Sequence, residues 1–299
     1  MVFRVAVAGG KGGVGKTTVA VNLAVALTGR GRAVLLVDAD VDNPNDHVNL
    51  GIKPVKISDI SLFAPKIDEE ACTTCGMCAQ NCPENALLAR SGKPPVFFED
   101  RCSGCRICEL ICPSGAIREG SKVIGYLFSG TRRLLKLLGA ELRPGEARSP
   151  LVVRALMEHA DALLSSGHFE IVVVDCPPGL GNTTVRAMMG SDIVLLITEP
   201  TPLGLSTLKL SKRALERLGL RGLVVVNRAD VSGKGLDAIK AFLAKGGLDL
   251  LIEIPYDEEA VRASVEGVPL VEVAPSSRAG KALTRLADVI DAMVGSASP

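Results

Sequence analysis

The apolar residues of this chain gather in short continuous runs that alternate with segments of helical spacing. Runs rich in Val, Ile and Leu cover residues 3–9, 33–40, 170–179, 192–200, 222–230 and 248–257. Helical spacing is found in residues 16–27, 150–164, 203–218 and 276–295. Continuous apolar strands are buried on both faces, and their alternation with helices is typical of parallel sheets. The pattern therefore predicts an α/β fold with a mostly parallel sheet covered by helices on both faces.

The pattern changes between residues 66 and 120, where cysteines, prolines and short apolar pieces replace long strands. We interpret this segment of 55 residues as an inserted small α+β domain. The remaining residues, 1–65 and 121–299, amount to 244, a size suited to one α/β domain.

The composition is that of an ordinary globular protein. Its hydrophobic content is 47% and its formal net charge is +1, so no bulk field attracts nucleic acid or anionic lipid. No apolar run reaches the roughly 18 residues that span a bilayer. The N-terminus leads straight into a glycine-rich loop instead of a cleavable signal, and we expect a cytoplasmic protein. The closing segment 276–295 has a polar face of mixed charge, which favours a packed helix over a membrane anchor.

A phosphate-binding motif follows the first apolar run. "GKGGVGKT" at residues 10–17 satisfies GxxxxGK[ST] between a predicted strand and a predicted helix. Glycines at these positions let backbone N–H groups surround phosphate oxygens, and the helix N-terminus adds positive potential. Lys16 supplies a charge to the β and γ phosphates, and Thr17 is expected to ligate Mg²⁺. Predicted nucleotide contacts are Gly10, Lys11, Gly12, Gly13, Val14, Gly15, Lys16, Thr17 and Thr18.

Eight of the nine cysteines form two runs of the pattern CxxCxxCxxxCP, offset by 30 residues. This pattern is typical of bacterial ferredoxins with two 4Fe-4S clusters, in which the fourth cysteine of each run serves the other cluster. The predicted ligand sets are Cys72, Cys75, Cys78 and Cys112 for one cluster, and Cys82, Cys102, Cys105 and Cys108 for the other. Zinc is a weaker interpretation, because a third close cysteine followed by Cys-Pro has no use in a zinc site. Two adjacent clusters suggest electron transfer, although a structural role stays open.

The chain outside the insert resembles the deviant Walker A ATPases, the family that includes MinD, ParA and the nitrogenase iron protein. The resemblance rests on "KGGVGKTT", "LLVDAD", "DCPPG" and "IPYDEEAVRASVEGVPL". It implies that Lys11 reaches across a nucleotide-dependent homodimer to the partner's ATP. It also implies that Asp40 orients the attacking water and belongs, with Thr17 and Asp175, to the Mg²⁺ site. Asp38 and Asp42 are alternates for Asp40.

The motif "NRAD" at residues 227–230 is similar to the base-reading motif of GTPases. Asn227, with Pro255 from the late family segment, is the predicted base contact. Asp230 is open to two interpretations, a contact with guanine or a cap for the next helix. We favour ATP because the other motifs match the ATPase branch.

Two further features leave their roles open. Cys176, beside Asp175, is interpreted as an inert buried thiol, with a redox role as the alternative. The basic stretch containing Arg132, Arg133, Lys136, Arg143 and Arg148 is interpreted as solvated surface, with an acidic partner as the alternative.

The combination of motifs is similar to MinD-like ATPases with an inserted ferredoxin domain and to Mrp-type iron-sulfur carrier ATPases. The primary hypothesis is an ATP-driven dimer switch coupled to electron transfer with an unidentified redox partner. The alternatives are an ATP-dependent cluster carrier or assembly protein, and a ParA-like or MinD-like positioning ATPase with redox-sensing clusters. We expect ATP, Mg²⁺ and two 4Fe-4S clusters as cofactors, and neither nucleic acid nor membrane as partner.

Overall fold

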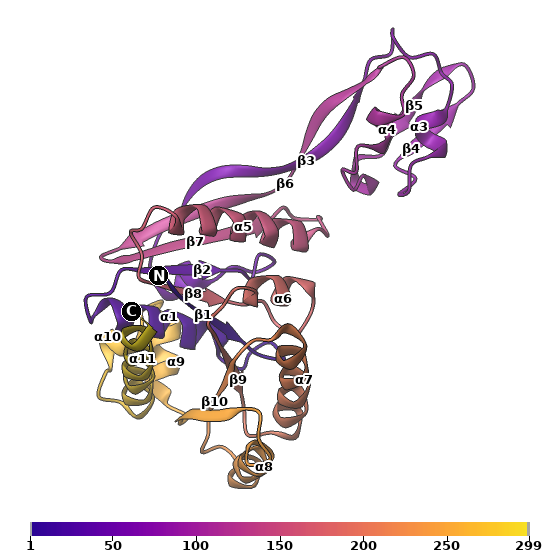
Figure 1. The fold of residues 1–299 in the computed structure, drawn as a ribbon. Coiled ribbons are helices and arrows are strands. Elements are labelled where there is room, and N and C mark those ends of the chain that lie inside the picture. Colours follow the sequence, from indigo (N-terminus) through magenta and orange to yellow (C-terminus); the bar gives the residue numbers. More distant parts are fainter. Residues whose placement is uncertain (1, 298–299) are drawn as a thin grey trace. The chain divides into compact units, whose positions relative to one another are not determined.

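The computed structural model describes residues 2–297. The larger of its two sheets has the strand order β11-β10-β9-β1-β8-β2-β7-β6-β3 (Figure 1). β1 pairs in parallel with β8 and β9, β2 with β7 and β8, and β10 with β9 and β11. The predicted mostly parallel sheet is confirmed. The parallel strands are β1 Phe3–Ala8, β2 Val34–Asp38, β7 Leu135–Leu142, β8 Ile171–Asp175, β9 Ile193–Thr198, β10 Gly222–Asn227 and β11 Asp249–Ile254.

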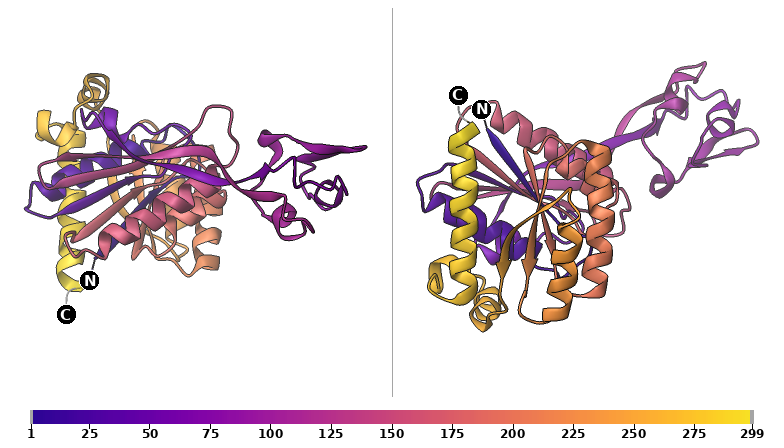
Figure 2. Two further views of the ribbon diagram at one scale, coloured as in Figure 1. Left: turned by 90° about the horizontal axis from the view of Figure 1, so that it is seen from above. Right: turned by 60° about the horizontal axis from the view of Figure 1, so that its bottom comes forward.

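Helices cover both faces of this sheet (Figure 2). α1, α10 and α11 contact one another on one face. On the opposite face, α5 packs on α6, and α7 packs on α8. Right-handed crossovers require this division, because the chain moves one way along the sheet through α1 and the opposite way through α5 to α8. The helices are α1 Lys16–Thr28, α2 Asp46–Asn49, α5 Ser149–Leu164, α6 Asn182–Met188, α7 Pro202–Leu218, α8 Gly233–Leu243, α9 Glu258–Glu266, α10 Leu270–Val273 and α11 Arg278–Ala297.

Three strands of the sheet were not predicted: β3 Val55–Ile67, β6 Ile117–Arg132 and β7. β6 and β7 are joined by only two residues, which requires an antiparallel hairpin. β3 begins with five exposed residues and β6 contains glycines and charges, so neither has a continuous apolar run.

The chain divides into two compact units. The first contains the residues up to Ile57, Leu127–Glu141 and those from Ser149 onward; the second contains Ser58–Tyr126 and Leu142–Arg148. Both β3 and β6 therefore begin in one unit and end in the other. The segment 66–120 lies inside the second unit, which also takes in the separate strip 142–148.

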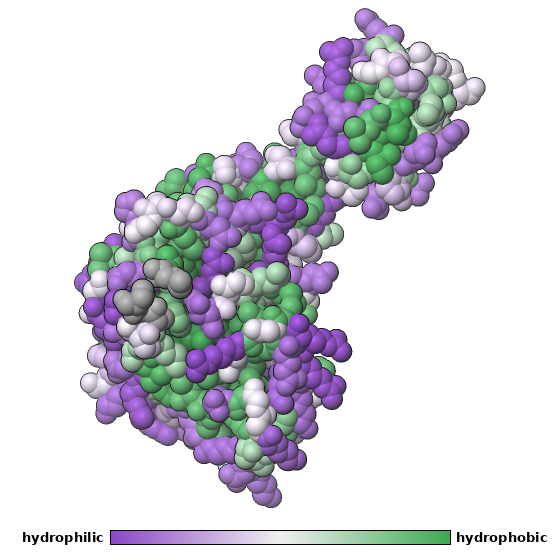
Figure 3. Space-filling model, in the orientation of Figure 1, coloured by the Kyte–Doolittle hydropathy of each residue, from purple (hydrophilic) through white to green (hydrophobic). Residues whose placement is uncertain are grey.

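The second unit is built from short elements. These are α3 Met77–Gln80, β4 Leu87–Arg90, β5 Lys93–Phe97, the 3₁₀ turn Glu99–Arg101 and α4 Ile107–Leu110, with β4 and β5 forming an antiparallel pair. Its small core contains Cys78, Leu87, Cys108 and Ile117. Figure 3 shows an apolar area on the surface of this unit, whose exposed apolar side chains include Met77, Leu88 and Leu110.

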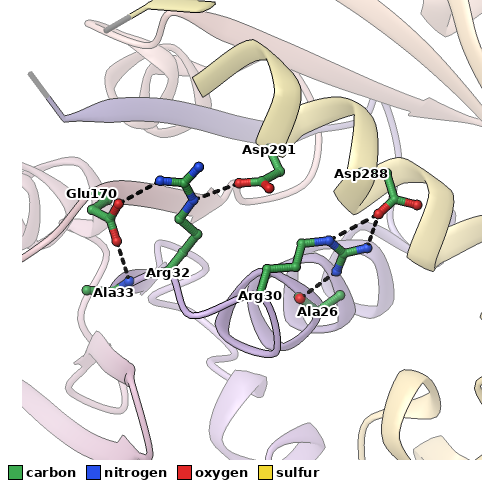
Figure 4. Close-up of polar contacts among 7 residues, drawn as sticks. All are labelled: Ala26, Arg30, Arg32, Ala33, Glu170, Asp288 and Asp291. Atoms are coloured by element: carbon green, nitrogen blue, oxygen red, sulfur yellow. Dashed lines mark hydrogen bonds and ion pairs between the residues drawn. The ribbon is translucent and has the colours of Figure 1, made fainter. Parts of the chain in front are cut away.

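The closing helix α11 packs as predicted. Its apolar stripe is buried against α1 and β11. Asp288 and Asp291 of α11 accept hydrogen bonds from Arg30 and Arg32, which follow α1, and Arg32 also pairs with Glu170 (Figure 4). Exposed ion pairs of this kind contribute little individually, so burial of the stripe is the main stabilising contribution. The buried residues of the stripe are Ala279, Ala282, Leu283, Leu286, Ala287, Ile290 and Val294.

Candidate functional site

The predicted phosphate loop lies between β1 and α1 at the carboxyl edge of the parallel strands. Gly15, with φ +95°, occupies the N-cap position of α1, where no side chain caps the helix. The first N–H groups of α1 are thus left for an anion. A Cβ at Gly15 would lie 2.3 Å from the Asn227 amide nitrogen, so only glycine fits.

A cavity of about 610 Å³ opens over this loop. The predicted residues that line it are Gly12, Gly13, Gly15, Lys16, Thr17, Thr18 and Asp40. Gly10 packs on Thr207 of α7, and the Val14 side chain is buried. The loop therefore faces the cavity mainly through glycine backbone and the Lys16–Thr18 segment, as phosphate binding requires.

Thr17 lines the phosphate cavity, and the carboxylate of Asp175 is buried and contacts it. Thr17 Oγ1 donates to Asp175 Oδ2 at 2.6 Å, and Asp175 Oδ1 is buried without a hydrogen-bond donor. A buried carboxylate oxygen with no partner is costly unless a cation or its water approaches. The donor set of hydroxyl and carboxylate oxygen thus fits a hydrated Mg²⁺ beside a phosphate.

Lys11 does not face the phosphate cavity of its own chain. Its Nζ lies 3.0 Å from Oε2 of Glu199, whose other oxygen accepts from Arg228 Nη1 at 2.6 Å. Glu199 is largely buried, so these contacts neutralise it. Sequence analysis missed Glu199, although a carboxylate directly after the apolar strand β9 lies at the edge where open sheets bind ligands.

The acidic residues after β2 divide into a buried and an open group. Asp38 is buried and accepts hydrogen bonds from the backbone N–H groups of Asp40, Asn45 and Asp46, so it organises the loop. Asp40 and Asp42 instead line the phosphate cavity. Burial raises the pKa of Asp40, and nearby Lys16 opposes that rise. Of the two alternates to Asp40, only Asp42 is open to the cavity.

Asp46 was not predicted and forms a buried acidic group with Asp38 and Asp175. Neither oxygen of Asp46 has a donor from the described residues, and its carboxyl faces that of Asp175. Burial, followed by repulsion from Asp38 and Asp175, raises the pKa of Asp46 well above its usual range. Burial, followed by repulsion from Asp175, raises the pKa of Asp38 to about 8, and burial raises the pKa of Asp175 to about 6.

These shifts predict that the nucleotide-free, Mg²⁺-free protein loses stability as pH rises. The folded state binds protons that the unfolded carboxyls release near pH 4, so this stabilisation is complete below pH 4 and disappears as pH rises through about 6 to 8. Scanning calorimetry should show a falling melting temperature between pH 6 and pH 8.5, by about 2–4 °C for each kcal/mol lost. Asp46→Asn should flatten this slope, because the amide removes a buried carboxyl whose own pKa is raised and which therefore takes up a proton on folding. An equal slope in both proteins would contradict the assignment.

A second cavity, of about 280 Å³, adjoins the phosphate cavity and shares Gly15 and Arg228 with it. Asn227 and Pro255, the predicted base contacts, line it together with apolar side chains of α9. The Asn227 amide also braces the phosphate loop, because Nδ2 donates to the Val14 carbonyl at 2.9 Å. The walls thus suit a flat, largely apolar group such as a base.

Asp230 is not among the residues that line this cavity. Its Oδ1 accepts the Tyr256 N–H at 2.7 Å, and its Oδ2 pairs with Arg278 at 2.9 Å. The helix-cap interpretation is wrong, because Ser232 caps α8 by accepting from Gly235. Both carboxylate oxygens are engaged elsewhere, so they are not directed at a guanine.

The eight repeated cysteines gather around two cavities in the second unit. Cys72, Cys75, Cys78 and Cys112 line one cavity. Cys82, Cys102, Cys105 and Cys108 line the other. Each cavity thus takes three cysteines from one run and the fourth from the other run. Among residues 2–297, no group of three or more Cys, His, Asp or Glu side chains is placed to hold a metal ion.

The backbone of the two runs repeats with the same offset as the cysteines. Left-handed residues occur at Thr74 and Gly104, at Gly76 and Arg106, and at Asn85 and Gly115. Gly76 and Arg106 precede the short helices that carry Cys78 and Cys108, both buried. The repeat therefore extends from sequence to conformation.

Backbone amides point at cysteine sulfurs in this unit. The Ala86 N–H donates to Cys82 Sγ at 3.2 Å. Although burial opposes it, hydrogen bonds from Ser114 and from the Ala116 and Ile117 amides lower the pKa of Cys112. Donors directed at sulfur stabilise a thiolate, the form that binds iron. The residues present therefore fit thiolate-ligated clusters.

The remaining cysteine, Cys176, is fully buried in the first unit, and burial raises the pKa of its thiol far above the usual range. A thiol of this kind is unreactive. Of the basic stretch, Arg132 and Arg148 depart from the interpretation as solvated surface. Arg132 pairs with Glu272 of α10 and has a buried guanidinium nitrogen, and the Arg148 guanidinium contacts Glu146 and the Cys102 carbonyl. Among the described residues, no helix is long and apolar enough to cross a bilayer.

Comparisons with known proteins agree with the α/β fold and with the phosphate loop. Residues 5–270 match the profile of the CobQ/CobB/MinD/ParA nucleotide binding domain. The chain is 26% identical to an uncharacterized ATP-binding protein of Methanocaldococcus jannaschii, over 96% of this chain and 87% of that protein. It is also 26% identical to the iron-sulfur cluster carrier protein of Aquifex aeolicus, over 98% and 68% of the two chains. The crystal structure of the cell division ATPase MinD of Pyrococcus furiosus superposes with a TM-score of 0.63 at 26% identity, covering 98% of this chain and all of that one.

Proposed function

The chain belongs to the CobQ/CobB/MinD/ParA nucleotide-binding family, and on this basis we propose that it is an ATPase that carries two 4Fe-4S clusters and delivers them under nucleotide control. The proposal rests on two cavities, each lined by four cysteines, in a chain whose other unit contains a phosphate loop. Members of this family bind ATP, so the first unit supplies the nucleotide site.

The nucleotide in this proposal is Mg-ATP. Lys16 and the N–H groups of the loop bind the phosphates, and Thr17 and Asp175 hold hydrated Mg²⁺. Asp40, open to the cavity, orients the attacking water. The engagement of Asp230 by Tyr256 and Arg278 supports ATP over GTP.

The ATP-bound form in this proposal is a homodimer. Lys11 leaves Glu199 and reaches the nucleotide of the partner, as the resemblance to deviant Walker A ATPases implies. The contact with Glu199 supports this, because it holds Lys11 away from the chain's own phosphates while no partner is present. Hydrolysis then returns the dimer to single chains.

The second unit holds the clusters in the crossed sets that line the two cavities. When bound, a 4Fe-4S cluster accepts or donates one electron, or serves as cargo for another protein. Cys75 and Cys105 are exposed, so each cavity has a cysteine at the surface that a partner can reach.

Cluster delivery is favoured over electron transfer because several relatives, from Aquifex aeolicus, Pyrococcus horikoshii and Synechocystis, are named iron-sulfur cluster carrier proteins. Electron transfer is the second candidate. It is favoured by the placement of two four-cysteine cavities within one small unit, an arrangement suited to passing electrons between clusters.

Cluster transfer to an apo-enzyme that needs a 4Fe-4S cluster tests the proposal. Anaerobically reconstituted protein should restore the acceptor's activity about fivefold faster with Mg-ATP than without nucleotide, a change typical of coupled sites. The Lys16→Ala variant, loaded with the same amount of iron, should transfer at the nucleotide-free rate. Clusters that stay bound through repeated reduction and oxidation, with no transfer under any condition, would contradict delivery and support electron transfer.

A further inference from the structure

The loop after β2, which lines the nucleotide cavity, is hydrogen-bonded to the first residue of α5. Asp42, which lines that cavity, accepts a hydrogen bond from Ser149 Oγ at 2.7 Å. Ser149 is the first residue of α5 and the first residue of the first unit after the strip Leu142–Arg148. This hydrogen bond therefore joins a residue of the nucleotide cavity to the N-terminus of α5.

Arg148, the residue before Ser149, contacts the backbone at Cys102, which lines one of the two cysteine cavities. The Arg148 guanidinium donates to the Cys102 carbonyl and, at 3.2 Å, to the Asp100 carbonyl. It also pairs with Glu146, whose nearly buried carboxylate lies 3.0 Å from the buried Lys122 ammonium. Buried and charge-assisted contacts hold the strip 142–148 firmly, so Arg148 fixes the backbone that carries Cys102.

Arg148 and Ser149 are joined by a peptide bond, so two hydrogen-bonded sites lie on neighbouring residues of the chain. We propose that Arg148 and Ser149 are positioning residues through which nucleotide binding acts on the cavity lined by Cys82, Cys102, Cys105 and Cys108. This rests on the proposed binding of ATP and two clusters. It goes further in assigning the effect of nucleotide to one of the two clusters, the one that includes Cys102.

Two single-cluster backgrounds isolate the effect. Cys112→Ala leaves the cluster that contains Cys102, and Cys82→Ala leaves the other. In each background, the rate of iron release to a ferrous chelator is measured with and without Mg²⁺ and a non-hydrolysable ATP analogue. The analogue should change the rate about fivefold in the Cys112→Ala background and leave it unchanged in the Cys82→Ala background.

Variants of the two positioning residues then test the path. In the Cys112→Ala background, Ser149→Ala should abolish the nucleotide effect, and Ser149→Thr, which keeps the hydroxyl, should restore it. Ser165→Ala, which removes a hydroxyl at the far end of α5, is the matched control and should behave like its parent. Arg148→Lys keeps the charge but not the fork that reaches Glu146 and both carbonyls, so it should also lose the effect.

Iron content and affinity for the analogue are measured separately in every protein. In the Cys112→Ala background, the inference is overturned if Ser149→Ala keeps the parent's iron content, its affinity for the analogue and its nucleotide effect on iron release. A nucleotide effect found only in the Cys82→Ala background, or in neither background, would also overturn it. Parent chains that bind no iron or no nucleotide would instead overturn the proposed function. The two failures are thus distinguishable.

Discussion

Replacing Cys112 and Cys72 together with alanine is expected to remove about four iron atoms per chain, no more than either replacement removes alone. Both residues line the same cavity, so losing one ligand already prevents that cluster from binding. Replacing Cys112 and Cys102 together should remove about eight, because these residues line different cavities although they belong to one sequence run. Iron analysis after anaerobic reconstitution measures both results.

This pair of double variants separates crossed from uncrossed ligation. If each run bound its own cluster, Cys112 and Cys102 would share a cluster and their double variant would lose only four iron atoms. Cys176→Ala is the matched control, because this buried cysteine lies in the first unit and should leave the iron content unchanged. Alanine is preferred to serine, whose oxygen is able to replace the sulfur.

Lys16→Ala and Lys11→Ala should separate nucleotide binding from hydrolysis. Lys16 lines the phosphate cavity, and loss of its charge-assisted hydrogen bonds costs roughly 3 kcal/mol, or about a hundredfold in ATP affinity. Lys11 contacts Glu199 instead. Its removal should leave ATP affinity within about twofold of the parent but abolish ATP-dependent dimerisation and hydrolysis.

Isothermal calorimetry, light scattering and phosphate release measure the three quantities. Lys245→Ala removes a charge near the end of α8, away from the residues that line either nucleotide cavity, and is the matched control. Full hydrolysis by Lys11→Ala would contradict its proposed action on the partner. Tight ATP binding by Lys16→Ala would remove the basis for the phosphate site.

The sequence predicted the elements whose pattern is set by burial on both sides. The parallel strands other than β7 are continuous apolar runs, so their positions can be predicted without knowledge of their neighbours. β7 was missed because Lys136 and Gly139 interrupt its apolar run. β3 and β6 are half exposed, and their strand conformation depends on pairing with each other and with β7, which local pattern does not reveal.

The candidate sites show the same division. The phosphate loop and the cysteine repeat are motifs with fixed spacing, so they were found. Glu199, Asp46 and Arg148 act through partners far away in the sequence: Lys11, Asp175 and Cys102. A lone charged residue carries no local sign of its partner, and only the fold brings the two together.

The exchange of the fourth cysteine between the two cavities also sets an order for biosynthesis. Chains emerge from the ribosome N-terminus first. The cysteine set that begins at Cys72 is incomplete until Cys112 has been made, whereas the other gains its last cysteine at Cys108. Both sets therefore become complete within four residues of synthesis, and a nascent chain that carries only the first run has neither set of four cysteines.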